Sequence, residues 1–166
     1  MTDEQLKTLS AANGHLLLQR QATVTTAESC TGGWIAKVLT DIAGSSAWFE
    51  RAFITYSNDA KQQMVGVSDQ SLQQWGAVSE QVVKEMALGA LKAANADFAI
   101  AVSGIAGPDG GTAEKPVGTV WFGFATAAGE TVQKMFVFQG NRDDVRRQTV
   151  ATALQVLHDD FLKKLT

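Results

Sequence analysis

The sequence contains a single cysteine, Cys30, and only two histidines, His15 and His158, among 166 residues. One cysteine cannot form a disulfide within the chain, and these three residues leave few of the ligands that structural zinc sites use. We therefore expect a fold held together by its hydrophobic core. The apolar fraction of 45% is sufficient for one, because a domain of about this size buries roughly 68–70% of its unfolded surface. The scarcity of cysteine fits a cytoplasmic location best.

Long hydrophobic stretches and an excess of positive charge are missing as well. Long segments without a charged residue, such as 98–108 and 116–129, contain glycine and fall short of the ~20 apolar residues that cross a bilayer. The first residues are acidic, unlike the start of a secretory signal. With 14 Lys and Arg against 17 Asp and Glu, the net charge is −3 and there is no basic stripe. We therefore expect neither a membrane span nor a nucleic-acid partner.

Hydrophobic periodicity predicts alternating helices and strands. Apolar residues recur at helical spacing over residues 3–20, 34–42, 79–94 and 145–165. Short apolar runs of strand length occupy residues 22–26, 52–56, 98–102, 117–126 and 131–138. The run at 98–102 is typical of a central strand with both faces covered, and the last two runs flank a four-residue connection that predicts a hairpin. The predicted fold class is α/β: a layered α/β/α sandwich with a mixed, partly parallel sheet, formed by one domain over residues 1–166.

The segment Glu28-Ser-Cys-Thr-Gly-Gly33 lies where a predicted strand meets a predicted helix. Unpaired N–H groups at a helix N-terminus favour negative charge, so a nucleophile here would be activated and its oxyanion stabilised. The alternative is structural: Ser29 or Thr31 caps the helix, and the glycines allow close packing. Cys30 is the nucleophile that residue type suggests first. A cysteine hydrolase also needs a histidine base, however, and both histidines fall in terminal helices, so we expect Cys30 to be a small buried residue.

Two further segments carry residues suited to chemistry. Tyr56-Ser-Asn-Asp-Ala-Lys61 follows a predicted strand, and its polar turn predicts the cap of a short helix. Lys61 could act as a general base only if its pKa fell by about three units from ~10.4; otherwise it is a solvated lysine. The loop from Gly104 to Pro116, preceded by Ser103, offers backbone N–H groups but matches neither the Walker nor the dinucleotide pattern. A loop of this length in a small domain is usually functional.

Arginines open the last predicted helix. Arg142 and Arg146 are four residues apart and share a helix face, so they could together hold a phosphate or a carboxylate. Asp143 and Arg147 have the same spacing and are expected to pair with each other. We therefore assign ligand binding to Arg142 and Arg146, with plain solvent exposure as the alternative, and no such role to Arg147.

Seven blocks of sequence follow one another in a recognisable order. They are Glu-Ser-Cys-Thr-Gly-Gly at 28–33, Ala-Gly-Ser-Ser at 43–46, Tyr-Ser-Asn-x-x-Lys at 56–61, Gly-Ala-Val-Ser at 76–79, Ser-Gly-Ile-Ala-Gly-Pro-x-Gly-Gly at 103–111, Lys-Pro-Val-Gly-Thr-Val at 115–120 and Gly-x-Arg-x-x-x-Arg at 140–146. In these blocks the chain resembles the CinA C-terminal domain family, the nicotinamide mononucleotide amidohydrolases. The resemblance spans nearly the whole chain and is to the stand-alone form of the domain. Asn141 departs from it, since an aspartate is usual there.

The resemblance implies hydrolysis of the carboxamide of nicotinamide mononucleotide to nicotinic acid mononucleotide and ammonia, in pyridine nucleotide salvage. It implies Ser29 as the nucleophile, Lys61 as its base and Tyr56 as a residue that relays the proton or orients the pair. The substrate-binding residues that it implies are Thr31, Gly32, Gly33, Ser103, Gly104, Gly107, Arg142 and Arg146. Amides in 31–33 or in 104–107 are alternatives for the oxyanion hole. This chemistry requires no metal or organic cofactor.

Two other functions stay open at this point. One is a cysteine amidase that uses Cys30 on another amide, and the other is a module that binds a pyridine nucleotide without turning it over. A homodimer is the expected assembly. The uncharged hairpin around Trp121 and Phe122 belongs either to the core or to an interface between subunits.

Overall fold

A mixed sheet of five strands, in the order β2-β1-β3-β4-β5, forms the centre of the computed structural model, which describes residues 1–163. The strands are β1 (Val24–Glu28), β2 (Phe53–Ile54), β3 (Phe98–Gly104), β4 (Thr119–Thr126) and β5 (Thr131–Val137). β1 runs parallel to β2 and β3, whereas β4 is antiparallel to β3 and β5. The predicted mixed sheet and the predicted hairpin are therefore confirmed.

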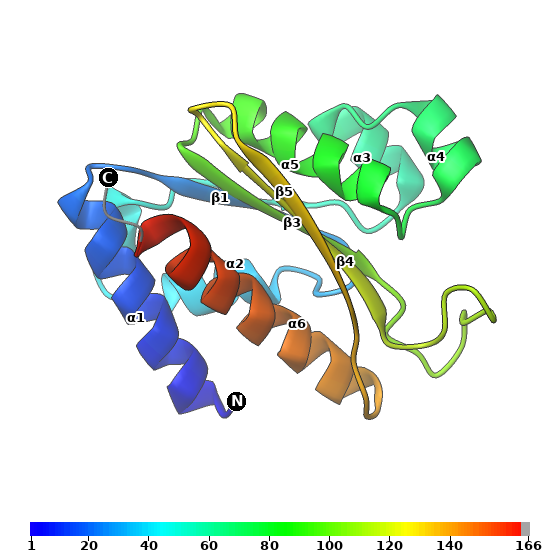
Figure 1. Ribbon diagram of the computed structural model, residues 1–166. Helices are drawn as coiled ribbons and strands as arrows, with labels where there is room; N and C mark the ends of the chain where they lie inside the picture. Colours follow the sequence, from blue (N-terminus) through cyan, green and yellow to red (C-terminus); the bar gives the residue numbers. More distant parts are fainter. Residues whose placement is uncertain (164–166) are drawn as a thin grey trace.

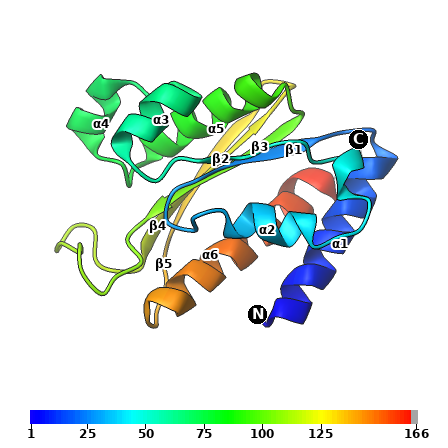
Figure 2. The ribbon, with the colours of Figure 1, turned by 180° about the vertical axis from the view of Figure 1, so that it is seen from behind.

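Helices cover both faces of this sheet (Figures 1 and 2). One face is covered by α1 (Asp3–Gln19), α2 (Trp34–Thr40) and α6 (Arg142–Val156), which continues as the π-type segment η2 (Leu157–Leu162). The other face is covered by α3 (Asn58–Val65), α4 (Asp69–Trp75) and α5 (Glu80–Ala94). A short 3-10 turn, η1 (Ser45–Ala47), follows α2 in the chain. The α/β/α sandwich that the sequence predicts is therefore the observed architecture.

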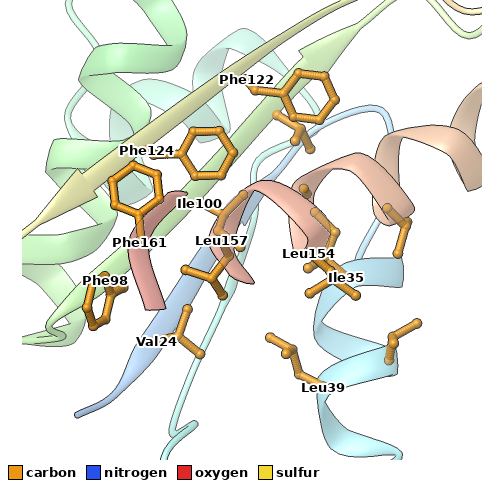
Figure 3. Close-up of a cluster of buried hydrophobic side chains, with 14 of the residues drawn as sticks. Val24, Ile35, Leu39, Phe98, Ile100, Phe122, Phe124, Leu154, Leu157 and Phe161 are labelled. Atoms are coloured by element: carbon orange, nitrogen blue, oxygen red, sulfur yellow. The ribbon is translucent and has the colours of Figure 1, made fainter. Parts of the chain in front are cut away.

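Alternating residues of β3 point into two separate cores, which explains why its sequence is apolar throughout. Phe98 and Ile100 join the core beneath α2 and α6, where Leu154 and Leu157 pack against them (Figure 3). Ala99 and Ala101 face the opposite core, under α5. These small side chains bring α5 close to the sheet.

Glycine 123 shows how close that approach is. A Cβ at Gly123 in β4 would lie 2.3 Å from the carbonyl oxygen of Val83 in α5. Phe122, its neighbour, is fully buried on the other face, and Trp121 packs partly buried against the α5 core. The uncharged hairpin therefore contributes to the core of this chain.

Several boundaries differ from the sequence prediction. β1 starts two residues later than expected and ends at Glu28, because Thr25, Thr26 and Glu28 are buried with their polar atoms hydrogen-bonded. The strand expected over 52–56 is only Phe53–Ile54. α4 was not predicted, since Leu72 is its one buried residue. Ser57 caps α3, within the polar turn that predicts such a cap, and Ser79 caps α5.

One ion pair predicted from the sequence is replaced by a contact with the N-terminal helix. The pair predicted between Asp143 and Arg147 is wrong: Arg147 Nη1 binds Asp3 Oδ1 at 2.7 Å, because α1 and α6 lie side by side. Leu165, predicted as part of the last helix, lies outside the described residues. Over residues 1–163, no helix combines the length and the apolar character needed to cross a bilayer.

Candidate active site

The candidate site lies at the carboxyl end of β1, where two connections leave the sheet in opposite directions. The loop after β1 leads to α2 on one face, whereas the segment after β2 leads to α3 on the other. Adjacent parallel strands whose connections diverge leave a crevice between them, which is where open α/β sheets bind ligands. The fold therefore brings Ser29, directly after β1, next to Lys61 on α3.

Lys61 and Ser29 are in direct contact. Lys61 Nζ lies 3.0 Å from Ser29 Oγ and donates to the carbonyl oxygens of Thr55 at 3.0 Å and Tyr56 at 3.3 Å. The lysine is only 1% exposed. Burial removes the ammonium from water and lowers the pKa of Lys61. A buried lysine held on two carbonyls and a serine hydroxyl is arranged to exchange a proton with that hydroxyl.

Glu28 anchors the loop that carries Ser29 through its side-chain carboxylate. Its fully buried carboxylate accepts hydrogen bonds from the hydroxyls of Thr26 and Thr31, at 3.0 and 2.6 Å. It also accepts from the main-chain amides of Ile35 and Ala36, both at 2.9 Å, in the first turn of α2. The negative charge lies where the helix dipole and the free amides of the helix N-terminus stabilise it.

A second anchor comes from the last helix. Arg146 Nε donates to the carbonyl of Cys30 at 3.0 Å, and its Nη2 donates to the carbonyl of Thr31 at 3.3 Å. The guanidinium also lies 5.7 Å from the ring centroid of Trp34. Arg146 therefore donates both of these hydrogen bonds to the loop that carries Ser29.

A pocket of about 280 Å³ opens over the Ser29–Lys61 pair. Six residues expected from the sequence line it: Ser29, Tyr56, Lys61, Ser103, Gly104 and Arg142. Four other lining residues, beside Cys30, were not expected as site residues: Asn58, Ala77, Val78 and Ala106. All four lie within the blocks at 56–61, 76–79 and 103–111, and that signal could have pointed to them.

Five expected residues lie next to the pocket without lining it. They are Thr31, Gly32, Gly33, Gly107 and Arg146. The Thr31 hydroxyl donates to Glu28, and Gly32 and Gly33 have φ of 60° and 100°, which shapes the turn into α2. The carbonyl of Gly107 accepts from Arg142 Nη1 at 2.8 Å. These residues hold or shape the segments that carry the lining residues.

Two roles are expected of Tyr56, to relay the proton or to orient the Ser29–Lys61 pair, and its backbone and side chain are placed differently. Its main-chain oxygen contacts Lys61, whereas its phenol oxygen accepts from Arg142 Nη2 at 3.3 Å. The side chain is 62% exposed at the rim of the pocket. It is therefore the backbone of Tyr56 that orients the lysine.

Cys30 is buried beside Ser29, as expected. Burial raises the pKa of its thiol to about 12, so the thiol stays protonated at neutral pH. Neither His15 nor His158 is among the residues that line the pocket. The structure thus gives the cysteine amidase interpretation neither an ionised thiol nor a histidine base.

Comparison with known proteins identifies the family of the chain. The model of the CinA C-terminal domain matches residues 6–161. The chain belongs to the CinA C-terminal domain family. It is 66% identical over 163 residues to the nicotinamide-nucleotide amidohydrolase PncC of Escherichia coli, covering 98% of this chain and 99% of that protein.

Further relatives span the same length. PncC of Pseudomonas putida is 49% identical, over 93% of this chain and 96% of its own. The crystal structure of a competence/damage inducible protein from Agrobacterium tumefaciens superposes with a TM-score of 0.92 at 44% identity, covering 99% of this chain and 98% of that one. This CinA-family chain thus matches those relatives across the whole domain.

Proposed function

We propose that this protein hydrolyses the carboxamide of nicotinamide mononucleotide, giving nicotinic acid mononucleotide and ammonia in pyridine nucleotide salvage. The observation that carries the proposal is the buried Lys61 Nζ at 3.0 Å from Ser29 Oγ, at the floor of a pocket. Similarity over nearly the full length to relatives named nicotinamide-nucleotide amidohydrolase supports the choice of substrate.

In the proposed reaction neutral Lys61 takes the proton of Ser29 as Oγ attacks the amide carbon. The tetrahedral intermediate collapses when protonated Lys61 gives its proton to the leaving nitrogen, which departs as ammonia. An ester on Ser29 remains. Water, deprotonated by Lys61, then attacks the ester carbon. The bond to Ser29 Oγ breaks, Lys61 returns its proton to Oγ, and the carboxylic acid is released. The positive charge of the pyridinium ring helps to keep Lys61 neutral, because like charges disfavour protonation.

The oxyanion formed in both steps needs N–H donors. The amide of Gly32 is occupied, because it donates to the carbonyl of Ser29 at 3.1 Å. Within residues 1–163 the amides of Thr31 and Gly33 donate to no acceptor. We assign the oxyanion hole to this turn, with the loop 104–107 as the alternative.

Arg142 and Arg146 have different roles in the proposed reaction. Arg142 lines the pocket and faces Tyr56, so we assign the 5′-phosphate of the substrate to its guanidinium. Arg146 is bonded to the carbonyls of Cys30 and Thr31, so we assign it to holding the nucleophile loop. Ser103 and Gly104 line the pocket and are assigned to the nicotinamide end of the substrate.

The proposal includes a homodimer in the cytoplasm, with no cofactor. Support for a second copy comes from β5, an edge strand on which Met135, Phe136 and Val137 are 48%, 38% and 44% exposed. Apolar side chains on an open sheet edge favour pairing with another chain. Light scattering on the purified protein gives the mass directly, and a monomer would remove this part of the proposal.

Ammonia release from nicotinamide mononucleotide by purified, chelator-treated protein tests the function. Ser29→Ala and Lys61→Ala should abolish turnover, whereas Cys30→Ala should keep it. If the wild-type protein binds the nucleotide by calorimetry but releases no ammonia, it is a binding module and the hydrolase proposal fails. Loss of turnover in Cys30→Ala alone would restore the cysteine amidase.

A further inference from the structure

The residues that line the pocket carry no negative charge. Among them are Arg142 and Lys61, and none is an aspartate or a glutamate. The substrate class of the proposed function carries a permanent positive charge on the pyridinium ring, directly beside the carboxamide that Ser29 attacks. Moving a cation out of water is costly unless something in the site compensates it. The pocket therefore needs a group other than a carboxylate that favours a cationic ring.

Tyr56 is the aromatic residue among those that line the pocket. Its main-chain oxygen contacts Lys61 Nζ at 3.3 Å and Ser29 Oγ at 3.5 Å, and its phenol oxygen is held by Arg142 Nη2 at 3.3 Å. The backbone of Tyr56 is thus held next to the nucleophile, and the phenol oxygen at the tip of its ring is held by Arg142. With 62% of the residue exposed, the ring has surface open to a bound ligand.

The face of an aromatic ring carries negative electrostatic potential and attracts cations. The hydroxyl of Tyr56, in contrast, is turned to Arg142 and contacts neither Ser29 nor Lys61. On the basis of the proposed function, we propose that the aromatic face of Tyr56 recognises the positive charge of the pyridinium ring. Tyr56 thereby selects oxidised pyridine mononucleotides over neutral, reduced ones.

Reduced nicotinamide mononucleotide is a suitable probe, because it keeps the ribose, phosphate and carboxamide but carries no charge on its ring. Dissociation constants for the oxidised and reduced nucleotides are measured by calorimetry in the Ser29→Ala background, where no turnover occurs. With Tyr56 present, the oxidised form should bind about tenfold more tightly, as expected for a partly desolvated cation–π contact. Tyr56→Phe should keep most of this ratio, because the ring remains. Tyr56→Leu should bring it close to one.

Trp75→Leu serves as the control, since Trp75 is also an exposed aromatic residue, on α4 and outside the pocket lining. It should leave the ratio unchanged. A Tyr56→Leu protein that still prefers the oxidised form overturns the proposal, as does a Tyr56→Phe protein that loses the ratio as fully as Leu. The binding ratio does not depend on turnover. Absence of ammonia release by the wild-type protein therefore overturns the hydrolase, whereas the ratio decides the role of Tyr56.

Discussion

Arg146 Nε donates a hydrogen bond over 3.0 Å to the main-chain carbonyl of Cys30, the residue that follows the candidate nucleophile. The two residues are 116 positions apart in the sequence. The last helix of the chain thus fixes the loop at the end of the first strand. The position of Ser29 therefore depends on the docking of α6.

Replacing Arg146 by Met should lower both turnover and stability. Two hydrogen bonds from a charged group to carbonyls would be lost, which costs about 2–3 kcal/mol of unfolding free energy. Displacement of Ser29 should lower kcat on the order of 10- to 100-fold. Urea denaturation and ammonia release measure the two effects. Arg147→Met is the matched control, because both arginines lie over the Trp34 ring, but Arg147 donates its hydrogen bonds to Asp3 and the carbonyl of Met1 and none to the Ser29 loop.

Arg142→Met should act on substrate binding. Without its guanidinium the KM for nicotinamide mononucleotide should rise about 10- to 100-fold, the range for a hydrogen bond to a charged group. Nicotinamide riboside has no phosphate, so its KM should change less than about threefold. Equal increases for both substrates would show that Arg142 does not bind the phosphate. Steady-state kinetics with the two substrates decides this.

Lys61 should make the stability of the protein depend on pH. Burial lowers the pKa of Lys61 from 10.5 in the folded state. Between that lowered pKa and 10.5, the unfolded chain binds more protons than the folded one, so the free energy of unfolding rises with pH. Lys61→Met lacks this contribution. The wild-type protein should therefore gain stability relative to Lys61→Met as the pH rises toward 10.5, as measured by urea denaturation.

Lys92→Met provides the control for that experiment, because Lys92 is exposed in the last turn of α5. The difference between the wild-type protein and Lys92→Met should stay constant over the same pH range. If the difference between the wild-type protein and Lys61→Met also stayed constant, burial would not lower the pKa of Lys61 in the folded protein.

Cys30 should resist alkylation while the protein is folded. Its thiol is buried and has a pKa raised to about 12, so almost none of it is thiolate at neutral pH. Iodoacetamide should label the native protein at least about 100-fold more slowly than the urea-unfolded chain, where the thiol is exposed with an ordinary pKa. Mass spectrometry over time measures both rates. Fast labelling of the native protein, with loss of ammonia release, would favour the cysteine enzyme instead.

The sequence predicted those parts of the fold that periodicity encodes. The apolar run of β3, the helix after Ser79 and the hairpin around 127–130 follow from local patterns, and the structure has them. It predicted the candidate site chiefly through the family blocks, since a lysine on a short helix gives no local sign of burial. Neither α4 nor the end of β1 was predictable in this way. α4 buries a single apolar residue, and β1 buries Thr25, Thr26 and Glu28, polar residues that a search for apolar runs does not assign to a buried strand.

The different placements of Arg142 and Arg146 were also not predictable from the sequence. Arg142 and Arg146 share a helix face, and spacing alone could not tell which of them lines the pocket. The difference depends on the loop 29–33 packing against one turn of α6, which is a tertiary contact. For the same reason the role of Glu28 was not predicted: its amide partners belong to a helix that begins six residues later.

Glu28→Gln should test how strongly the nucleophile loop depends on this buried carboxylate. All four groups that it binds are donors, so a glutamine amide would place an N–H₂ group against N–H or O–H groups. Unfolding free energy should fall by about 2–3 kcal/mol, and kcat should fall with it because Thr31 and the start of α2 lose their anchor. Glu80→Gln is the matched control, an exposed carboxylate in the first turn of α5. That change should cost less than about 1 kcal/mol, the size of a surface helix-dipole effect. If Glu28→Gln cost no more than Glu80→Gln, the loop would be held by Arg146 alone.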